Sequence, residues 1–185
     1  MHLVRDTLPE AEHNAGVKVS KTHTKGIGGS PPLVIGLGND DRGDDGCGLE
    51  ALRRLKKRVL KGVQFKDCQN DATALIDLWD GADIVIVVDA VQSGKAPGTI
   101  VRIEVGSEPL ASPLGSTSTH GLSLADAVSI GQSLKRFPRK LVIYGIEATD
   151  FTLGTGLTTS VARAVEDVVD RIASEIAHVS PAGGE

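Results

Sequence analysis

The sequence predicts an α/β protein, a three-layer αβα sandwich with a mostly parallel central sheet of about five strands. Short aliphatic runs alternate along the chain with segments whose apolar residues recur at helical spacing. The most apolar runs show no alternation of polar and apolar residues, as expected for strands that are buried on both faces. Together these two observations favour helices on both sides of a parallel sheet.

The first elements are read from apolar spacing. Residues 33–38 (LVIGLG) are a short apolar run with glycines, typical of a buried strand that enters a loop. Residues 48–60 carry leucines and a valine at helical spacing and predict a helix: Leu49, Leu52, Leu55 and Val59. Residues 63–68 (VQFKDC) predict a second strand.

The middle of the chain continues the alternation. Residues 71–82 predict a helix that begins at Asp71 and stops at Gly81. Residues 83–90 (DIVIVVDA) form the most hydrophobic run and predict a buried strand. Residues 97–105 predict a fourth strand after a Pro-Gly turn.

The last three elements complete the sandwich. Residues 119–134 predict a helix with Ser123 as N-cap and Asp126 three residues later, a variant of the capping box. Residues 140–148 predict a fifth strand, and residues 156–179 predict a long amphipathic helix.

The two ends of the chain differ in composition from the middle. Residues 1–31 are polar and lack apolar periodicity, so we expect a flexible N-terminal tail. Residues 179–185 are expected to form a flexible C-terminal end, which leaves 32–178 as a single α/β domain. At 185 residues in total, the chain is long enough to bury a sizeable core.

Charge and cysteine content narrow the class of protein. A net charge of −4 gives no general attraction to nucleic acid or to an anionic membrane. Two cysteines make no disulfide framework, and we find neither a secretory signal nor a long apolar segment. We therefore expect a cytoplasmic monomer with no nucleic-acid or membrane partner.

Four aspartates crowd the segment VIGLGNDDRGDDGCG, directly after the first strand. Such carboxylates repel one another unless a cation or hydrogen-bond donors neutralise them. An EF-hand loop that starts at Asp41 is excluded, because Leu52 stands where a bidentate Glu is required. A dinucleotide fingerprint fails because Asp41 replaces its third glycine. Capping of the next helix by Asp44 and Asp45 explains at most two of the four.

Two further polar residues are expected at the same edge of the sheet. Asp89 ends the most hydrophobic strand, and His120 precedes a helix. Taken alone, Asp89 serves equally well as a turn cap, and a lone loop histidine is more often solvated than a ligand. Ligands of open α/β sheets, however, collect at the carboxyl ends of the strands. Two carboxylates and an imidazole suit a borderline divalent ion such as nickel or zinc, with coordination positions left open.

Four segments in order resemble the nickel–iron hydrogenase maturation proteases, endopeptidases that trim the C-terminal tail of the hydrogenase large subunit. The first is a Gly-x-Gly-Asn and Asp-Asp-Gly-x-Gly pattern made of Gly36, Gly38, Asn39, Asp44, Asp45, Gly46 and Gly48. The others are IVIVVDAVQSGKAPGTI, STHGLSLADAV and GIEATDFTLGTGLTTSV. The resemblance covers about residues 33 to 176.

The resemblance implies a site and a substrate. The family's two acidic metal ligands and its histidine fall on Asp45, Asp89 and His120, which are the expected catalytic and metal-binding residues. The implied partner is a hydrogenase large-subunit precursor that already carries nickel, so the metal comes with the substrate and no organic cofactor is expected. Asn39 and Asp44 are candidates for positioning the ligands or the substrate.

One stretch departs from the family pattern. Many relatives carry an Asp-Gly-Gly-Thr-like sequence after the second strand, where this chain has DCQNDATAL. Asp67 takes the first of those positions, but the glycines are absent. This loop is expected to help select the partner hydrogenase.

Two alternative functions stay open at this point. In the first, Cys47 is a nucleophile with His120 as its base and Asp89 as the orienting group, since thiolates are favoured at helix starts. Neighbouring aspartates would raise the pKa of that thiol. In the second, the chain is a non-catalytic nickel- or peptide-recognition module on the same scaffold.

Three other features allow more than one interpretation. The cationic run RRLKKR (53–58) fits a solvated helix face better than a docking site for an acidic partner. Leu78 and Trp79 fit either the core or an exposed patch. Cys68 is expected to be a buried residue at a strand end.

Overall fold

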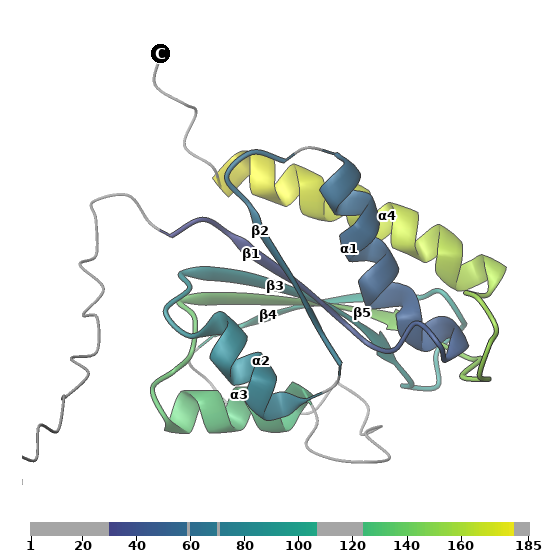
Figure 1. The fold of residues 1–185 in the computed structure, drawn as a ribbon, viewed down its shortest axis with the longest axis horizontal. Helices are drawn as coiled ribbons and strands as arrows, with labels where there is room; N and C mark the ends of the chain where they lie inside the picture. The colour runs from purple at the N-terminus through teal and green to yellow at the C-terminus, as the bar shows by residue number, and fades with distance from the viewer. Residues whose placement is uncertain (1–29, 59, 70, 107–123, 180–185) are drawn as a thin grey trace, which may run out of the picture.

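The sheet of this protein has five strands in the order β2-β1-β3-β5-β4 (Figure 1). The computed structural model describes residues 30–58, 60–69, 71–106 and 124–179. Within them the strands are β1 (Leu33–Leu37), β2 (Gln64–Cys68), β3 (Ile84–Val91), β4 (Ile100–Val105) and β5 (Lys140–Glu147). Strands β2, β1, β3 and β5 run parallel, and β4 pairs antiparallel with β5. This confirms the predicted mostly parallel sheet.

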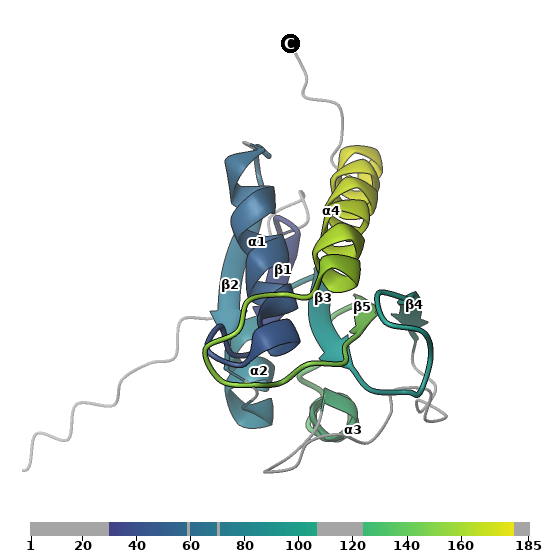
Figure 2. The same cartoon turned by 90° about the vertical axis from the view of Figure 1, so that its right-hand side faces the viewer.

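Helices cover both faces of the sheet, as the sandwich prediction requires (Figure 2). The helical elements are the 3-10 helix η1 (Gly43–Gly46), α1 (Cys47–Lys57), α2 (Ala72–Trp79), α3 (Leu124–Ser133) and α4 (Thr159–Val179). Helices α1 and α4 contact each other on one face, and α2 and α3 contact each other on the opposite face. Among these described helices, none is long and apolar enough to cross a membrane.

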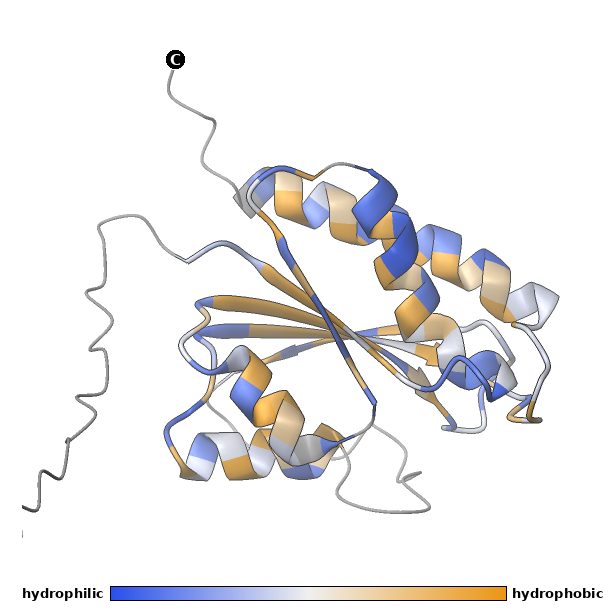
Figure 3. Ribbon diagram, viewed as in Figure 1, coloured by the Kyte–Doolittle hydropathy of each residue, from blue (hydrophilic) through white to orange (hydrophobic). Residues whose placement is uncertain are grey.

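Two apolar clusters, one on each face of the sheet, form the core (Figure 3). Alternate residues of β1 face opposite clusters: Ile35 packs on the side of α2 and α3, and Val34 packs on the side of α1 and α4. Every residue of β1 is buried, so the strand needs no polar face. Trp79 is fully buried and its indole N–H donates to the Arg136 carbonyl oxygen at 2.9 Å, which assigns it to the core. Leu78 is partly buried against the same cluster.

Some helices begin where a local capping residue predicts, and others begin where tertiary contacts determine. Helix α2 begins after Asp71, whose carboxylate accepts hydrogen bonds from the backbone N–H groups of Thr73 and Ala74, as predicted. Helix α4 was expected to start at residue 156 but starts at Thr159. The backbone N–H and hydroxyl of Thr158 donate instead to a distant carboxylate, that of Asp44. Ser123, the predicted cap of α3, lies outside the described residues.

The chain crosses from one side of β1 to the other between β2 and β3. Helix α1 leads from β1 outward to β2, and α2 leads back across β1 to β3 on the opposite face. The carboxyl ends of β1 and β3 therefore form a topological switch point, where open α/β sheets bind their ligands.

Candidate active site

The start of α1 lies directly on the strand ends at the switch point, and glycines permit this close approach. A Cβ atom on Gly48 would stand 2.3 Å from the Leu37 carbonyl oxygen and 2.4 Å from that of Val88. Gly38 has a φ of +122°, and a Cβ there would stand 1.8 Å from the Asp45 carbonyl oxygen. The glycines of the sequence motif thus bring η1, which carries Asp45, against the end of β3.

Asp45 and Asp89 interact electrostatically at this edge of the sheet. Burial, and secondly the charge of Asp45, together raise the pKa of Asp89 from 3.8 to about 7. Burial also raises the pKa of Asp45, against the opposing effects of the Arg42 charge and a backbone hydrogen bond from Asn39. Both side chains stay partly exposed. The carboxylate pair is therefore accessible and short of positive charge.

The third predicted ligand, His120, lies outside the described residues. Among the residues that the structure describes, no three His, Cys, Asp or Glu side chains gather closely enough to hold a metal ion. The two carboxylates nevertheless suit a divalent cation, since its charge would relieve the repulsion that raises the pKa of Asp89. The His120 assignment stays a prediction.

Asp44, a candidate for positioning the ligands or the substrate, is buried and holds the backbone beside Asp45 in place. Its side chain is fully buried, and its carboxylate accepts hydrogen bonds from the backbone N–H groups of Thr149, Asp150 and Thr158 at 3.1, 3.0 and 2.7 Å. The Thr158 hydroxyl donates a fourth at 3.2 Å. The chain's own donors thus surround Asp44, which ties η1 to the segment between β5 and α4.

Asn39 also has a local role. Its side-chain oxygen accepts a hydrogen bond from the Asp41 backbone N–H at 2.9 Å, and its carbonyl oxygen accepts one from the Arg42 N–H at 3.1 Å. These bonds shape the turn between β1 and η1. Asn39 supports Asp45 through its backbone, as described above.

Glu147 is a buried charged residue that the sequence analysis missed. It ends β5, and its Oε1 accepts hydrogen bonds from the backbone N–H groups of Ser93, Gly94 and Lys95 at 2.8, 2.8 and 3.2 Å. The Ser93 hydroxyl donates to Oε2 at 2.7 Å. A signal was present in the sequence, because Glu147 comes directly after an apolar run in the same way as Asp89 does.

Cys47 is a poor nucleophile in this structure. Its thiol is fully buried in the cluster beneath α1 and α4. Burial raises its pKa well above the usual value, and the charges of Asp89, Asp45 and Asp44 raise it further. This speaks against the Cys47 hydrolase alternative. Cys68 is a buried residue at the end of β2, as predicted.

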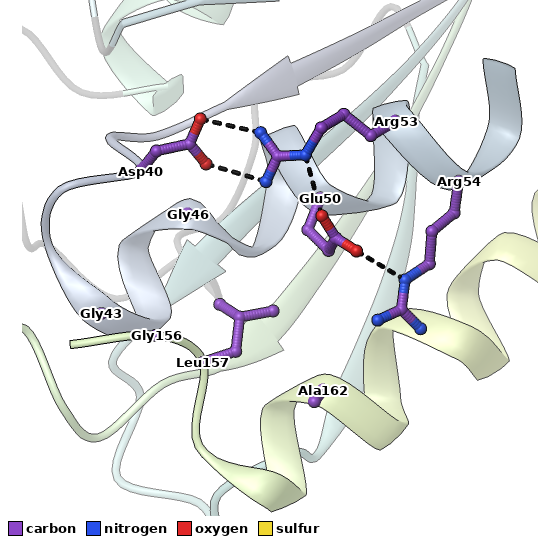
Figure 4. A pocket seen from close by; sticks show the side chains of 9 residues that line it. All are labelled: Asp40, Gly43, Gly46, Glu50, Arg53, Arg54, Gly156, Leu157 and Ala162. Carbon is purple, nitrogen blue, oxygen red and sulfur yellow. Dashed lines mark hydrogen bonds and ion pairs between the residues drawn. The ribbon is translucent and has the colours of Figure 1, made fainter. Parts of the chain in front are cut away.

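The cationic run on α1 forms ion pairs within the chain. Arg53 binds Asp40 through two nitrogens at 2.8 and 2.9 Å and also binds Glu50 (Figure 4). Arg54 bridges Glu50 and Glu166. Asp40, Glu50 and the two arginines line an open pocket of about 320 Å³, which Leu157 also borders. The run is therefore a solvated helix face, and Asp40 belongs to its ion pairs rather than to the acidic site.

The fold and the site define an α/β protein with an accessible carboxylate pair at the switch point of its sheet. A family model described as hydrogenase maturation protease matches residues 50–175. The chain belongs to the hydrogenase maturation protease family, which confirms the resemblance found in the sequence. Membership supports a peptidase role in hydrogenase maturation. Asp89 lies within the matched residues and Asp45 lies just before them.

Individual relatives agree with this assignment. A hydrogenase maturation protease of Methanocaldococcus jannaschii, so named provisionally, is 34% identical over 151 residues, which cover 78% of this chain and 95% of that protein. The hydrogenase expression/formation protein HupD of Thiocapsa roseopersicina is 28% identical over 120 residues, 64% of this chain, which span 54% of its length. The solved structure of the hydrogenase maturating endopeptidase HybD from Escherichia coli aligns with a TM-score of 0.69 at 25% identity, over 80% of this chain and 92% of that one.

The raised pKa of Asp89 predicts a pH dependence of stability. A carboxyl whose pKa is raised from 3.8 to about 7 on folding binds its proton more tightly in the folded state. Its contribution therefore stabilises the fold at low pH and is lost as the pH rises from about 4 through about 7. We expect Asp89→Asn to raise the free energy of unfolding of the metal-free protein by on the order of 1–2 kcal/mol at pH 8. At pH 4 the substitution should change this free energy little. Urea unfolding at both pH values measures this, and equal effects at the two pH values would contradict it.

Proposed function

We propose that this protein is the endopeptidase that removes the C-terminal extension from a nickel-loaded [NiFe]-hydrogenase large-subunit precursor. Family membership supports the class of reaction and the kind of partner. The observation that carries the proposal is the pair of interacting carboxylates, Asp45 and Asp89, at the switch point of the sheet. The pair is partly exposed, so a substrate group can reach it.

The chemistry of the pair favours a substrate that brings a cation. Asp45 and Asp89 repel each other when both are ionised, and burial adds to the cost of their charges. A precursor that carries nickel supplies the missing positive charge, whereas a nickel-free precursor leaves the repulsion in place. His120 is the proposed third ligand. This gives a physical reason for cleavage only after nickel insertion, and the scissile bond would then lie beside the bound ion.

Mass spectrometry of the precursor tests the proposal. Nickel-loaded and nickel-free precursor are each incubated with the protein and their masses are compared with those of untreated samples. We expect the nickel-loaded form to lose a C-terminal peptide and the nickel-free form to stay intact. An unshortened nickel-loaded precursor in a stable complex with the protein would instead support the non-catalytic recognition module.

Replacement of Cys47 separates this proposal from thiol catalysis. Since the Cys47 thiol is buried and its pKa is raised, we expect Cys47→Ala to remove the extension at a rate within about twofold of wild type. The loss of a small buried side chain should lower the free energy of unfolding by about 1 kcal/mol. Cys68→Ala serves as the matched control, because Cys68 is also a free buried cysteine. A folded Cys47→Ala variant without activity would restore the thiol mechanism.

A further inference from the structure

Two buried carboxylates hold segments at the edge of the sheet that carries the site. Among the described residues, the buried charged side chains are Asp44 and Glu147, which are 0% and 3% exposed. Glu147 orders the turn after β3, and Asp44 orders the segment between β5 and α4. Burial of a carboxylate is unfavourable unless strong hydrogen bonds offset it. In both cases the donors are backbone groups of a connecting segment, so the result is an ordered rim around the acidic pair.

The segment between β5 and α4 is fixed at several further points. The Asp150 carbonyl oxygen accepts a hydrogen bond from the Asp44 N–H at 2.8 Å, and the Asp41 carbonyl oxygen accepts one from the Gly154 N–H at 2.9 Å. The Thr152 N–H donates to the Asp150 side chain at 2.9 Å. Figure 2 shows this segment running beside η1 and the start of α1. It is a preformed surface next to the site.

Leu153 projects from this fixed segment with 74% of its surface exposed. A single exposed leucine is ordinary on a protein surface. Leu153 differs because the residues on both sides of it are hydrogen-bonded and because it lies on the rim of the site. Ordered backbone lowers the entropy lost on association, so an apolar side chain presented this way is suited to anchor a partner.

The charges beside Leu153 indicate the kind of surface it fits. Asp41 is exposed, and its carbonyl oxygen holds the residue after Leu153. Asp150 lies three residues before Leu153, and hydrogen bonds within the segment hold its pKa below the usual value, which keeps it ionised at neutral pH. An apolar side chain on a segment that carries the Asp150 carboxylate and is bound to the backbone of Asp41 fits an apolar pocket that is bordered by basic side chains.

We propose that the segment 149–157, with Leu153 as its apolar anchor, docks the folded body of the substrate protein. The inference rests on the proposed function for the identity of the partner. The docking segment lies outside the carboxylate pair. Its contacts would therefore contribute to the affinity for the precursor independently of the nickel. The acidic setting of Leu153 predicts that the contacted face of the precursor is basic around an apolar pocket.

The test uses Leu153→Asp and a matched control, Leu134→Asp. Leu134 is also an exposed leucine, 57% exposed, and it follows α3. Binding of the nickel-loaded large-subunit precursor is measured by biolayer interferometry and its cleavage by mass spectrometry. We expect Leu153→Asp to raise Kd and KM about tenfold with kcat within about twofold of wild type, and Leu134→Asp to leave all three within about twofold. Equal thermal midpoints for both variants establish that the fold is retained.

The outcomes separate this inference from the proposed function. If the wild-type protein binds the precursor through Leu153 but never shortens it, the docking surface stands and the proposed function fails. If the wild-type protein cleaves and Leu153→Asp binds as tightly as wild type, the docking surface is refuted and the function stands. Sedimentation adds a third outcome: a wild-type dimer that Leu153→Asp converts to a monomer would assign the surface to a second copy of this chain and overturn the inference.

Discussion

Asp89→Asn should reduce the rate at which the C-terminal extension is removed by at least about 100-fold, with the fold intact. The amide keeps the size of the side chain but removes the negative charge that the substrate's nickel would meet. The proximity of Asp45 makes this charge costly in the free protein, and only a cation makes it favourable. The rate is measured by mass spectrometry of nickel-loaded precursor over time.

The matched control for this variant is Asp77→Asn. Asp77 is an aspartate of α2 that pairs with Arg136 at the surface, away from the switch point. The Asp77→Asn variant should cleave the nickel-loaded precursor at the wild-type rate. Asp89→Asn should cleave at least about 100-fold more slowly than wild type and yet be more stable at pH 8, a combination that damage to the fold does not produce. Wild-type cleavage by Asp89→Asn would remove the carboxylate pair from the mechanism.

Asp44→Ala should lower the free energy of unfolding by about 3–5 kcal/mol. The substitution leaves three backbone N–H groups and the Thr158 hydroxyl without their acceptor, in a place that is closed to water. It also frees η1 from the segment between β5 and α4. Urea unfolding followed by circular dichroism measures the loss.

Two variants calibrate the Asp44 result. Asp41→Ala removes an exposed carboxylate from the same turn and should change stability by less than about 0.5 kcal/mol. Asp44→Asn keeps one acceptor oxygen but turns an N–H₂ group toward the backbone donors, so its effect should be intermediate. An Asp44→Ala protein with the urea midpoint of Asp41→Ala would show that the four hydrogen bonds contribute little.

The sequence by itself determined the elements whose causes are local. The aliphatic side chains of β3 avoid water only if both faces of the strand are buried. The Asp71 carboxylate caps α2 by accepting hydrogen bonds from the backbone N–H groups two and three residues later. The alternation of strands and helices is then compatible with few sheet topologies. In each of them the carboxyl ends of the parallel strands lie at the same edge of the sheet. This is why the aspartate cluster and Asp89 could be placed at one edge without coordinates, whereas the choice of Asp45 within the cluster came from the family resemblance.

Only the tertiary structure decided what each aspartate of the cluster does. Asp40 pairs with Arg53 on α1, Asp44 binds the segment 149–158, and Asp45 faces Asp89. Asp44 and Asp45 are neighbours with the same composition around them, so no local pattern separates them. Their roles differ because the turn of η1 directs one carboxylate inward, to donors more than a hundred positions away, and the other toward β3. Partners so distant in sequence are brought together by the packing of the whole domain, and no short-range signal records them.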